Sequence, residues 1–68
     1  MVNLEMLQKK IDHAGIPITT LAAKCGMTRN TLYNKMAGKS ELKASEMLLL
    51  SLALHLNRRE RDAIFFGD

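Results

Sequence analysis

The sequence predicts an all-α fold of short, closely packed helices, and three observations favour it. A chain of 68 residues is too short to build a second core, so we expect a single domain over residues 1–68. Apolar residues make up 47% of the chain but only three residues are aromatic, which predicts an aliphatic, methionine-rich core between helices. No stretch alternates polar and apolar residues over the length of a strand between turn signals.

The first predicted helix covers residues 4–14. Asn3 is a suitable N-cap, and Gly15 stands where a helix commonly ends. Four apolar residues at helical spacing are expected to form its buried stripe: Leu4, Leu7, Ile11 and Ala14. His13 lies beside this stripe without a second His, Cys or carboxylate at a metal-binding spacing, so no metal site is predicted.

A tight turn at Gly26 separates two short helices, predicted over residues 18–24 and 29–37. Three residues at helical spacing are expected to line the buried face of the first: Leu21, Ala22 and Cys25. Gly26 follows at once, where a left-handed backbone conformation costs a glycine nothing. The pattern is typical of a DNA-binding helix-turn-helix, in which the second helix reads the duplex.

The second of these helices is predicted to expose a polar face. Thr28 is a good N-cap, and Leu32 and Met36, four residues apart, are expected to face inward. Five residues then face outward: Arg29, Asn30, Tyr33, Asn34 and Ala37. Arginine can donate to guanine O6 and N7, asparagine can pair with adenine, and a tyrosine ring can contact a thymine methyl group.

The outward face has no acidic residue from Lys24 to Ser40, whereas a merely solvated helix surface more often carries Glu–Lys pairs four residues apart. Base reading is therefore the favoured interpretation, and a plain solvated surface is the alternative. The predicted base-reading residues are Thr28, Arg29, Asn30, Tyr33 and Asn34.

Positive charge is concentrated in the same part of the chain. Residues 17–43 carry five basic side chains against one acidic side chain, whereas residues 44–68 have a balance of −1. This asymmetry favours the approach of a polyanion to that side. Four residues near the loop 38–43 are predicted to contact phosphates: Lys35, Lys39, Ser40 and Lys43. Lys35 is expected to lay its stem along the core and extend its ammonium to a phosphate. The alternative is that the lysines only make this loop soluble.

The predicted helix over residues 44–56 is apolar nearly all round. Met47, Leu50 and Leu54 form one stripe, but Leu48, Leu49, Leu52 and Ala53 leave little polar surface. Such a helix is usually buried on most sides, so we expect the first helix, the last helix or a second subunit to cover it. His55 is expected near its C-terminus, where a protonated imidazole suits the helix dipole, and a catalytic role is the remote alternative.

Residues 57–60 form the pattern of a capping box that opens a last helix. This helix cannot direct two adjacent bulky aromatic rings at one partner. We therefore expect one of Phe65 and Phe66 to complete the core and the other to lie at its edge or in a dimer contact; the alternative is that both belong to the core. The candidate dimer contacts are Leu52, Phe65 and Phe66.

These residues resemble the Cro and phage-repressor type helix-turn-helix domains, also called the XRE family. The matching elements are Leu21–Ala22, Gly26, Thr28–Leu32 and Gly38–Lys39. The resemblance is closest to small phage-associated regulators, whose motifs correspond here to Thr31–Glu41 and Ile64–Phe66. It covers roughly Leu4 to Phe66 and implies a compact five-helix bundle of the phage-repressor DNA-binding domain type with a central helix-turn-helix.

The chain departs from this family at two places. Pro17–Ile18 stands where the family usually has Thr-Gln, whose glutamine commonly touches a DNA phosphate. That contact is absent here, and Thr19 or Thr20 is the expected substitute, with Thr20 taken as the candidate phosphate contact. Lys35 stands where the commoner repressors have an aliphatic residue, and its neighbour Met36 supplies the buried group, as in the phage subgroup.

We therefore expect a sequence-specific double-stranded DNA-binding transcription regulator, a small Cro-like repressor that is a homodimer at least on DNA. The alternative is a protein-interaction module with a helix-turn-helix shape, such as an antirepressor or antitoxin fragment. No nucleophile–base pair, metal cluster or phosphate loop predicts an enzyme, and neither a cofactor nor a small-molecule ligand is expected. Cys25 is expected to be a buried small hydrophobe rather than a reactive thiol. No signal peptide or membrane span is predicted, so a soluble cytoplasmic protein of a bacterium or phage-infected bacterium is expected.

Overall fold

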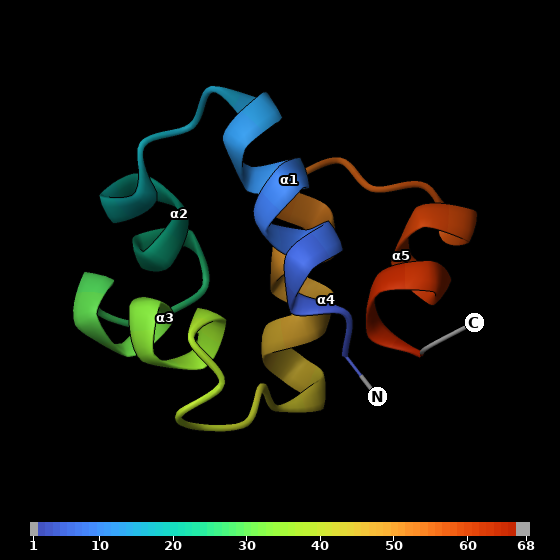
Figure 1. Ribbon diagram of the computed structural model, residues 1–68. Helices are drawn as coiled ribbons and strands as arrows, with labels where there is room; N and C mark the ends of the chain where they lie inside the picture. Colours follow the sequence, from blue (N-terminus) through green and yellow to red (C-terminus); the bar gives the residue numbers. More distant parts are fainter. Residues whose placement is uncertain (1, 67–68) are drawn as a thin grey trace.

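The computed structural model describes residues 2–66; residues 1, 67 and 68 of the predicted domain lie outside this range. Within it the chain forms five helices and no strand (Figure 1). The helices are α1 (Leu4–Ala14), α2 (Ile18–Lys24), α3 (Arg29–Met36), α4 (Ala44–Ala53) and α5 (Arg58–Phe65). The all-α prediction is confirmed for these residues. None of the five helices combines the length and the apolar run needed to cross a bilayer.

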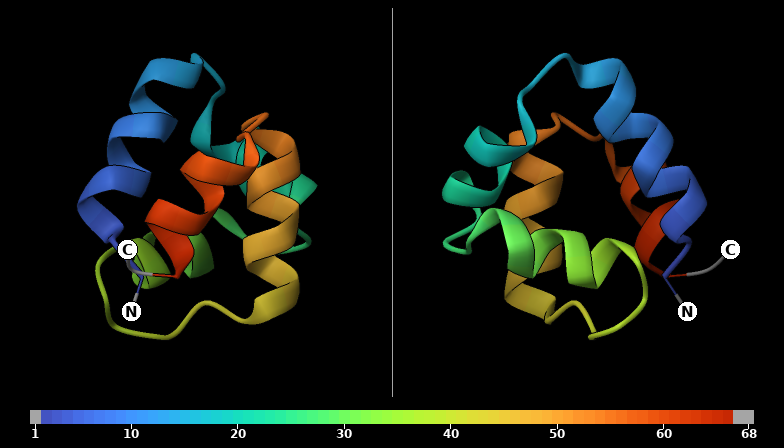
Figure 2. Two further views of the ribbon diagram at one scale, coloured as in Figure 1. Left: turned by 90° about the vertical axis from the view of Figure 1, so that its right-hand side faces the viewer. Right: turned by 60° about the vertical axis from the view of Figure 1, so that its left-hand side comes forward.

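Helix α4 lies behind α1, with α2 and α3 on one side and α5 on the other (Figure 1). Helix α2 packs against both α3 and α4, and α1 packs against α5. Viewed from the right-hand side of Figure 1, α5 lies between α1 and α4 (Figure 2, left). The exposed side of α3 and the outer side of α5 therefore belong to different sides of the molecule.

The core is formed by ten buried apolar residues from all five helices, the turn after α2 and the loop before α4. They are Leu7, Ile11, Leu21, Ala22, Cys25, Leu32, Leu42, Leu50, Ile64 and Phe65. Burial raises the pKa of the Cys25 thiol, and the nearby negative charge of Glu46 adds to this effect. Cys25 is thus the buried small hydrophobe that was predicted. Ala14, expected to continue the stripe of α1, is exposed because it is the last residue before the helix ends at Gly15.

Side chains that satisfy free backbone N–H groups fix where three of the helices begin. The side-chain oxygen of Asn3 accepts from the Met6 N–H at 3.0 Å, and Asn57 Oδ1 accepts from the Glu60 N–H at 2.8 Å. Glu60 accepts in return from the Asn57 N–H, which completes the predicted capping box. Thr28 caps α3 in the same manner. The predicted N-caps are therefore confirmed.

In a single copy of the chain, the other helices leave part of α4 uncovered, so covering of this part by a second subunit stays a prediction. Leu48 is 54% exposed and Leu52 is 64% exposed, while Leu50 on the opposite face is fully buried. The helix also ends three residues earlier than predicted, at Ala53, because the chain turns at His55. A 68-residue chain does not supply enough neighbouring surface to cover a helix that is apolar on nearly every side.

Candidate nucleic-acid interface

A short turn at Gly26 joins α2 to α3. The Gly26 N–H donates to the Ala23 carbonyl at 3.1 Å, and the Met27 N–H donates to the Ala22 carbonyl at 3.0 Å. These two bonds are those of a Schellman motif, whose left-handed residue is Gly26 at φ 70°. Ala22, at 1% exposed, lies in the core at the end of α2. The predicted role of Gly26 in the turn is confirmed.

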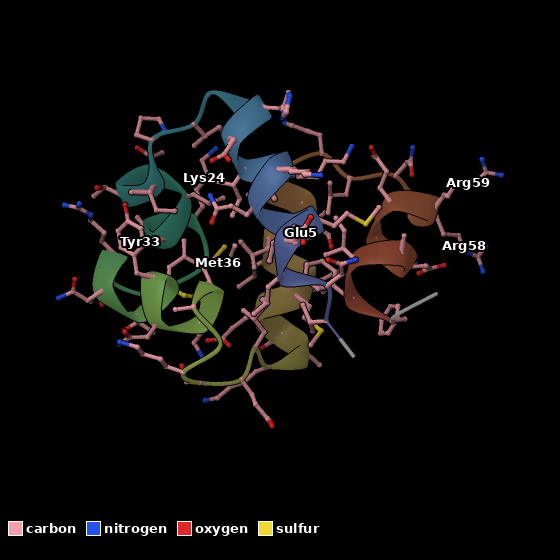
Figure 3. All side chains as sticks on the ribbon, viewed as in Figure 1. Glu5, Lys24, Tyr33, Met36, Arg58 and Arg59 are labelled. Carbon is pink, nitrogen blue, oxygen red and sulfur yellow. The ribbon has the colours of Figure 1, made fainter. Side chains whose placement is uncertain are left out.

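Helix α3 buries one side and exposes the other as predicted. Leu32 is fully buried, and Met36 is half-buried against the core. The outward residues are all exposed: Arg29, Asn30, Tyr33, Asn34 and Ala37. Figure 3 shows Tyr33 and Met36 on the side of α2 and α3, and Arg58 and Arg59 on the opposite side. The structure thus brings the predicted base-reading side chains together on one exposed face.

Two members of this face interact with each other. The Arg29 guanidinium lies over the Tyr33 ring, 5.3 Å from its centroid. A cation–π contact of this kind orders a long side chain that otherwise samples many rotamers. Sequence reasoning missed this pair, although the spacing of Arg29 and Tyr33, four residues apart on a helix, was a visible signal.

Thr28 has a structural role as well as a place on this face. Its hydroxyl accepts from the Thr31 N–H at 3.1 Å and forms a hydrogen bond of 2.8 Å with the Thr31 hydroxyl. Each hydroxyl has one proton, and one of the two protons lies between the oxygens. The pair therefore keeps a single O–H donor for any group that approaches from outside.

The predicted phosphate contacts are exposed with one exception. Four of them are exposed: Thr20, Lys39, Ser40 and Lys43. In Figure 1, α3 lies between α2, which carries Thr20, and the loop that carries the other three. These residues can flank the base-reading face on both sides.

Lys35 is the exception, and the prediction that it reaches a phosphate is wrong. Its residue is only 8% exposed, and its Nζ lies 2.9 Å from the Glu41 carbonyl oxygen and 3.0 Å from Glu46 Oε1. Lys35 lies three residues after Leu32, on the inward side of α3, so its ammonium points toward the first turn of α4. The Lys35 ammonium binds these two oxygens inside the protein, so it is not available to bind a phosphate at the surface.

The Glu46 carboxylate that accepts from Lys35 is held in its charged form. The Lys43 backbone N–H donates to Glu46 Oε1 at 2.8 Å, and this bond together with Lys35 lowers the pKa of Glu46 below its usual value. Lys35 and Glu46 therefore cancel each other's charge beneath the loop. The field at the surface is left to exposed basic residues such as Arg29, Lys39 and Lys43, against the exposed Glu41.

One acidic residue lies at the border of the face. Asp12 and Tyr33 both line a hollow between α1, the start of α2 and α3, and Asp12 Oδ1 accepts from Gln8 Nε2 at 2.9 Å. The outward residues of α3 itself include no carboxylate. Asp12 therefore bounds the exposed face of α3 on the side of α1.

The candidate dimer contacts are divided by the structure. Phe65 is 3% exposed and completes the core of a single copy, so its prediction as a dimer contact is wrong. Phe66 is 62% exposed and Leu52 is 64% exposed. Leu48 and Phe66 line one hollow between α4 and α5 together with Arg61. We call the exposed residues Leu48, Leu52 and Phe66 the apolar patch.

Within residues 2–66, no group of three or more His, Cys, Asp or Glu side chains is placed to hold a metal ion. No protein-family model, curated protein or solved structure matches the chain.

Proposed function

We propose that this chain is a sequence-specific double-stranded DNA-binding transcription regulator, a small repressor of the Cro type within the helix-turn-helix (XRE) family. The observation that carries the proposal is the exposed face of α3. It presents an arginine lying over a tyrosine ring and two asparagines, without a carboxylate among them. An α-helix fits the major groove of B-DNA, and these are the side-chain types that read guanine, adenine and thymine edges there.

The surroundings of α3 support the same proposal. Lys39, Ser40 and Lys43 follow the helix on an exposed loop, where they can contact phosphates and fix the register of the helix in the groove. Thr20 lies on α2, on the other side of α3. Phosphate contacts supply affinity for any duplex, while the base contacts of α3 supply the sequence preference.

Repression by occupancy needs two copies on the operator. One short helix makes few base contacts, each contributing about 1–3 kcal/mol of discrimination, which is too little to select one site in a genome. Two copies related by a two-fold axis place their reading helices about 34 Å apart, so each α3 lies about 17 Å from the axis. The molecule measures 28 × 24 × 19 Å, so two copies can lie side by side on a duplex with their reading helices at this separation.

Selection of bound sequences from a random duplex pool tests the proposal. We expect a two-fold symmetric consensus for the wild-type chain. Arg29→Ala and Asn30→Ala should each relax the preference at one position, at a cost of about 1–3 kcal/mol for the preferred base. Lys39→Ala should weaken all duplexes alike and reduce the salt slope by about one.

A matched control is Arg59→Ala, which removes an equally exposed positive charge from α5 on the opposite side of the molecule (Figure 3). It should leave both the consensus and the salt slope unchanged. If Arg29→Ala keeps the wild-type affinity and consensus, the assignment of α3 as the reading helix is incorrect.

The second candidate function is a protein-interaction module, and the exposed apolar patch favours it. A protein-only module should form no complex with random or genomic duplexes even at low salt, because it neutralises no phosphates and therefore releases no counterions from the DNA. Titration of the purified chain with duplex at decreasing salt concentration distinguishes the two functions.

A further inference from the structure

We propose that Lys35 and Glu46 are positioning residues for DNA binding. Their ion pair, in which Lys35 is buried and Glu46 is half-buried, holds the loop 38–43 at a fixed place relative to α3, and so sets where the phosphate contacts lie relative to the base-reading face. The inference rests on the proposed function and adds to it a pair of residues that touch no DNA.

The pair joins three successive parts of the chain at one ammonium group. Lys35 belongs to the last turn of α3, Glu41 lies in the loop, and Glu46 lies in the first turn of α4. The Lys35 Nζ donates to the Glu41 carbonyl at 2.9 Å and lies 3.0 Å from Glu46 Oε1. The side chains of Lys35 and Glu46 are only 9% and 15% exposed, so water competes weakly for these contacts.

The same carboxylate also fixes the end of the loop. Glu46 Oε1 accepts from the Lys43 N–H at 2.8 Å, in addition to its contact with Lys35. The start of the loop is held by the end of α3, where the Lys39 N–H donates to the Asn34 carbonyl at 2.9 Å. The loop is therefore tied at its start, at Glu41 and at its end.

Packing alone does not hold this loop. Gly38, Ser40 and Glu41 border a hollow of about 320 Å³, which Leu4 and Met47 also line. Leu42, at 9% exposed, is the one loop residue in the core. With space beneath the loop, directional hydrogen bonds from the ammonium decide where its backbone lies.

An ion pair shielded from water adds little to the free energy of unfolding. Replacing a buried pair by apolar residues of similar volume is often neutral or stabilising, because desolvation offsets the Coulombic gain. The double variant Lys35→Met with Glu46→Gln is therefore expected to fold. Glutamine keeps an oxygen that can accept from the Lys43 N–H, so the start of α4 stays capped while the tie to the loop is lost.

The matched control uses the ion pair between Lys10 of α1 and Glu60 of α5, which lies away from the loop. The double variant Lys10→Met with Glu60→Gln makes the same chemical change there. Both double variants and the wild type are compared by hydrogen exchange of the loop amides and by binding to the selected operator duplex, at a temperature where each is folded by circular dichroism.

In the Lys35/Glu46 variant we expect loop amides that exchange at least tenfold faster and an operator affinity at least tenfold weaker, with the consensus read by α3 unchanged. The Lys10/Glu60 variant should match the wild type in both measurements. Wild-type loop exchange or wild-type affinity in the Lys35/Glu46 variant overturns the inference, and so does an equal loss in the Lys10/Glu60 variant.

If the Lys35/Glu46 double variant does not fold, Glu46→Gln alone is measured against Glu60→Gln with the same expected ranking and the same overturning results. The exchange measurement needs no DNA. A wild-type chain that binds no duplex therefore refutes the proposed function, whereas unchanged loop exchange refutes the anchoring role of the pair.

Discussion

Replacing His55 by glycine is expected to stabilise this protein. His55 has φ 55° and is the non-glycine residue of positive φ within residues 2–66. It ends α4 in a Schellman motif, in which the Leu56 N–H donates to the Ser51 carbonyl at 2.9 Å and the His55 N–H donates to the Leu52 carbonyl at 3.2 Å. The turns after α2 and α3 place glycine at the equivalent position.

The size of the effect follows from two opposing contributions. The left-handed conformation costs a residue with a Cβ about 1–2 kcal/mol. Glycine is more flexible in the unfolded chain, which costs about 0.5–1 kcal/mol. The His55 side chain is exposed, so its removal loses no packing. The net gain is about 0–1.5 kcal/mol, centred near about 0.8 kcal/mol, which corresponds to roughly 3–6 °C in Tm for a domain of this size.

Thermal and urea unfolding followed by circular dichroism measure this gain. His55→Ala separates the imidazole from the backbone, because it removes the ring but keeps the strained Cβ. Gly26→Ala is the reciprocal control: an added Cβ meets no atom within 4 Å, so its expected loss of about 1 kcal/mol comes from φ +70° alone. Equal increases in Tm for His55→Gly and His55→Ala refute the reasoning, since the ring would then be the cause.

Three further predictions concern the core, a cap and an ion pair. Leu50→Ala should cost about 2–5 kcal/mol because Leu50 is fully buried, whereas Leu52→Ala, at a position 64% exposed, should stay within about 0.5 kcal/mol; urea unfolding compares them. Asn57→Ala should lower the free energy of unfolding by about 1 kcal/mol through loss of the cap on α5, which thermal unfolding measures. The Lys10 hydrogen bond and then the Asn57 N–H lower the pKa of Glu60 below its usual 4.5, so its contribution is complete above that value and is lost as pH falls through the lower folded pKa. The Tm difference between wild type and Glu60→Gln should therefore shrink on acidification, and a difference that grows in acid contradicts this sign.

The sequence was most informative where structure is set by neighbours along the chain. The starts of α1, α3 and α5 followed from Asn3, Thr28 and Asn57, because an N-cap acts within three residues. The end of α4 was not predicted, because no glycine marks it. His55 adopts the left-handed conformation there that the usual pattern assigns to glycine. Exposure of the α3 face was also predictable, since it requires only the spacing of Leu32 and Met36.

Contacts between distant residues were the part that sequence reasoning could not supply. Lys35 was predicted to reach a phosphate because a lysine can lay its stem along the core while its ammonium stays in water. Its partner Glu46 lies eleven residues later, on the far side of a loop whose path no local pattern specifies. The spacing from Leu32 to Lys35 does favour an inward direction. That signal alone could not outweigh the usual preference of lysine for the surface until the half-buried Glu46 carboxylate was found opposite it.

The positions of α3 and the apolar patch relate DNA binding to self-association. Phe66 follows α5, which lies on the side of the molecule away from α3 (Figure 1). Leu48 lines the same hollow as Phe66. A second copy seated on Leu48 and Phe66 leaves α3 exposed in both copies, so duplex DNA and the second copy can be bound together. A self-contact through α3 would instead compete with DNA. Sedimentation of the chain with and without operator duplex separates the two arrangements, because only in the first can the paired chain bind duplex without losing the contact between its two copies.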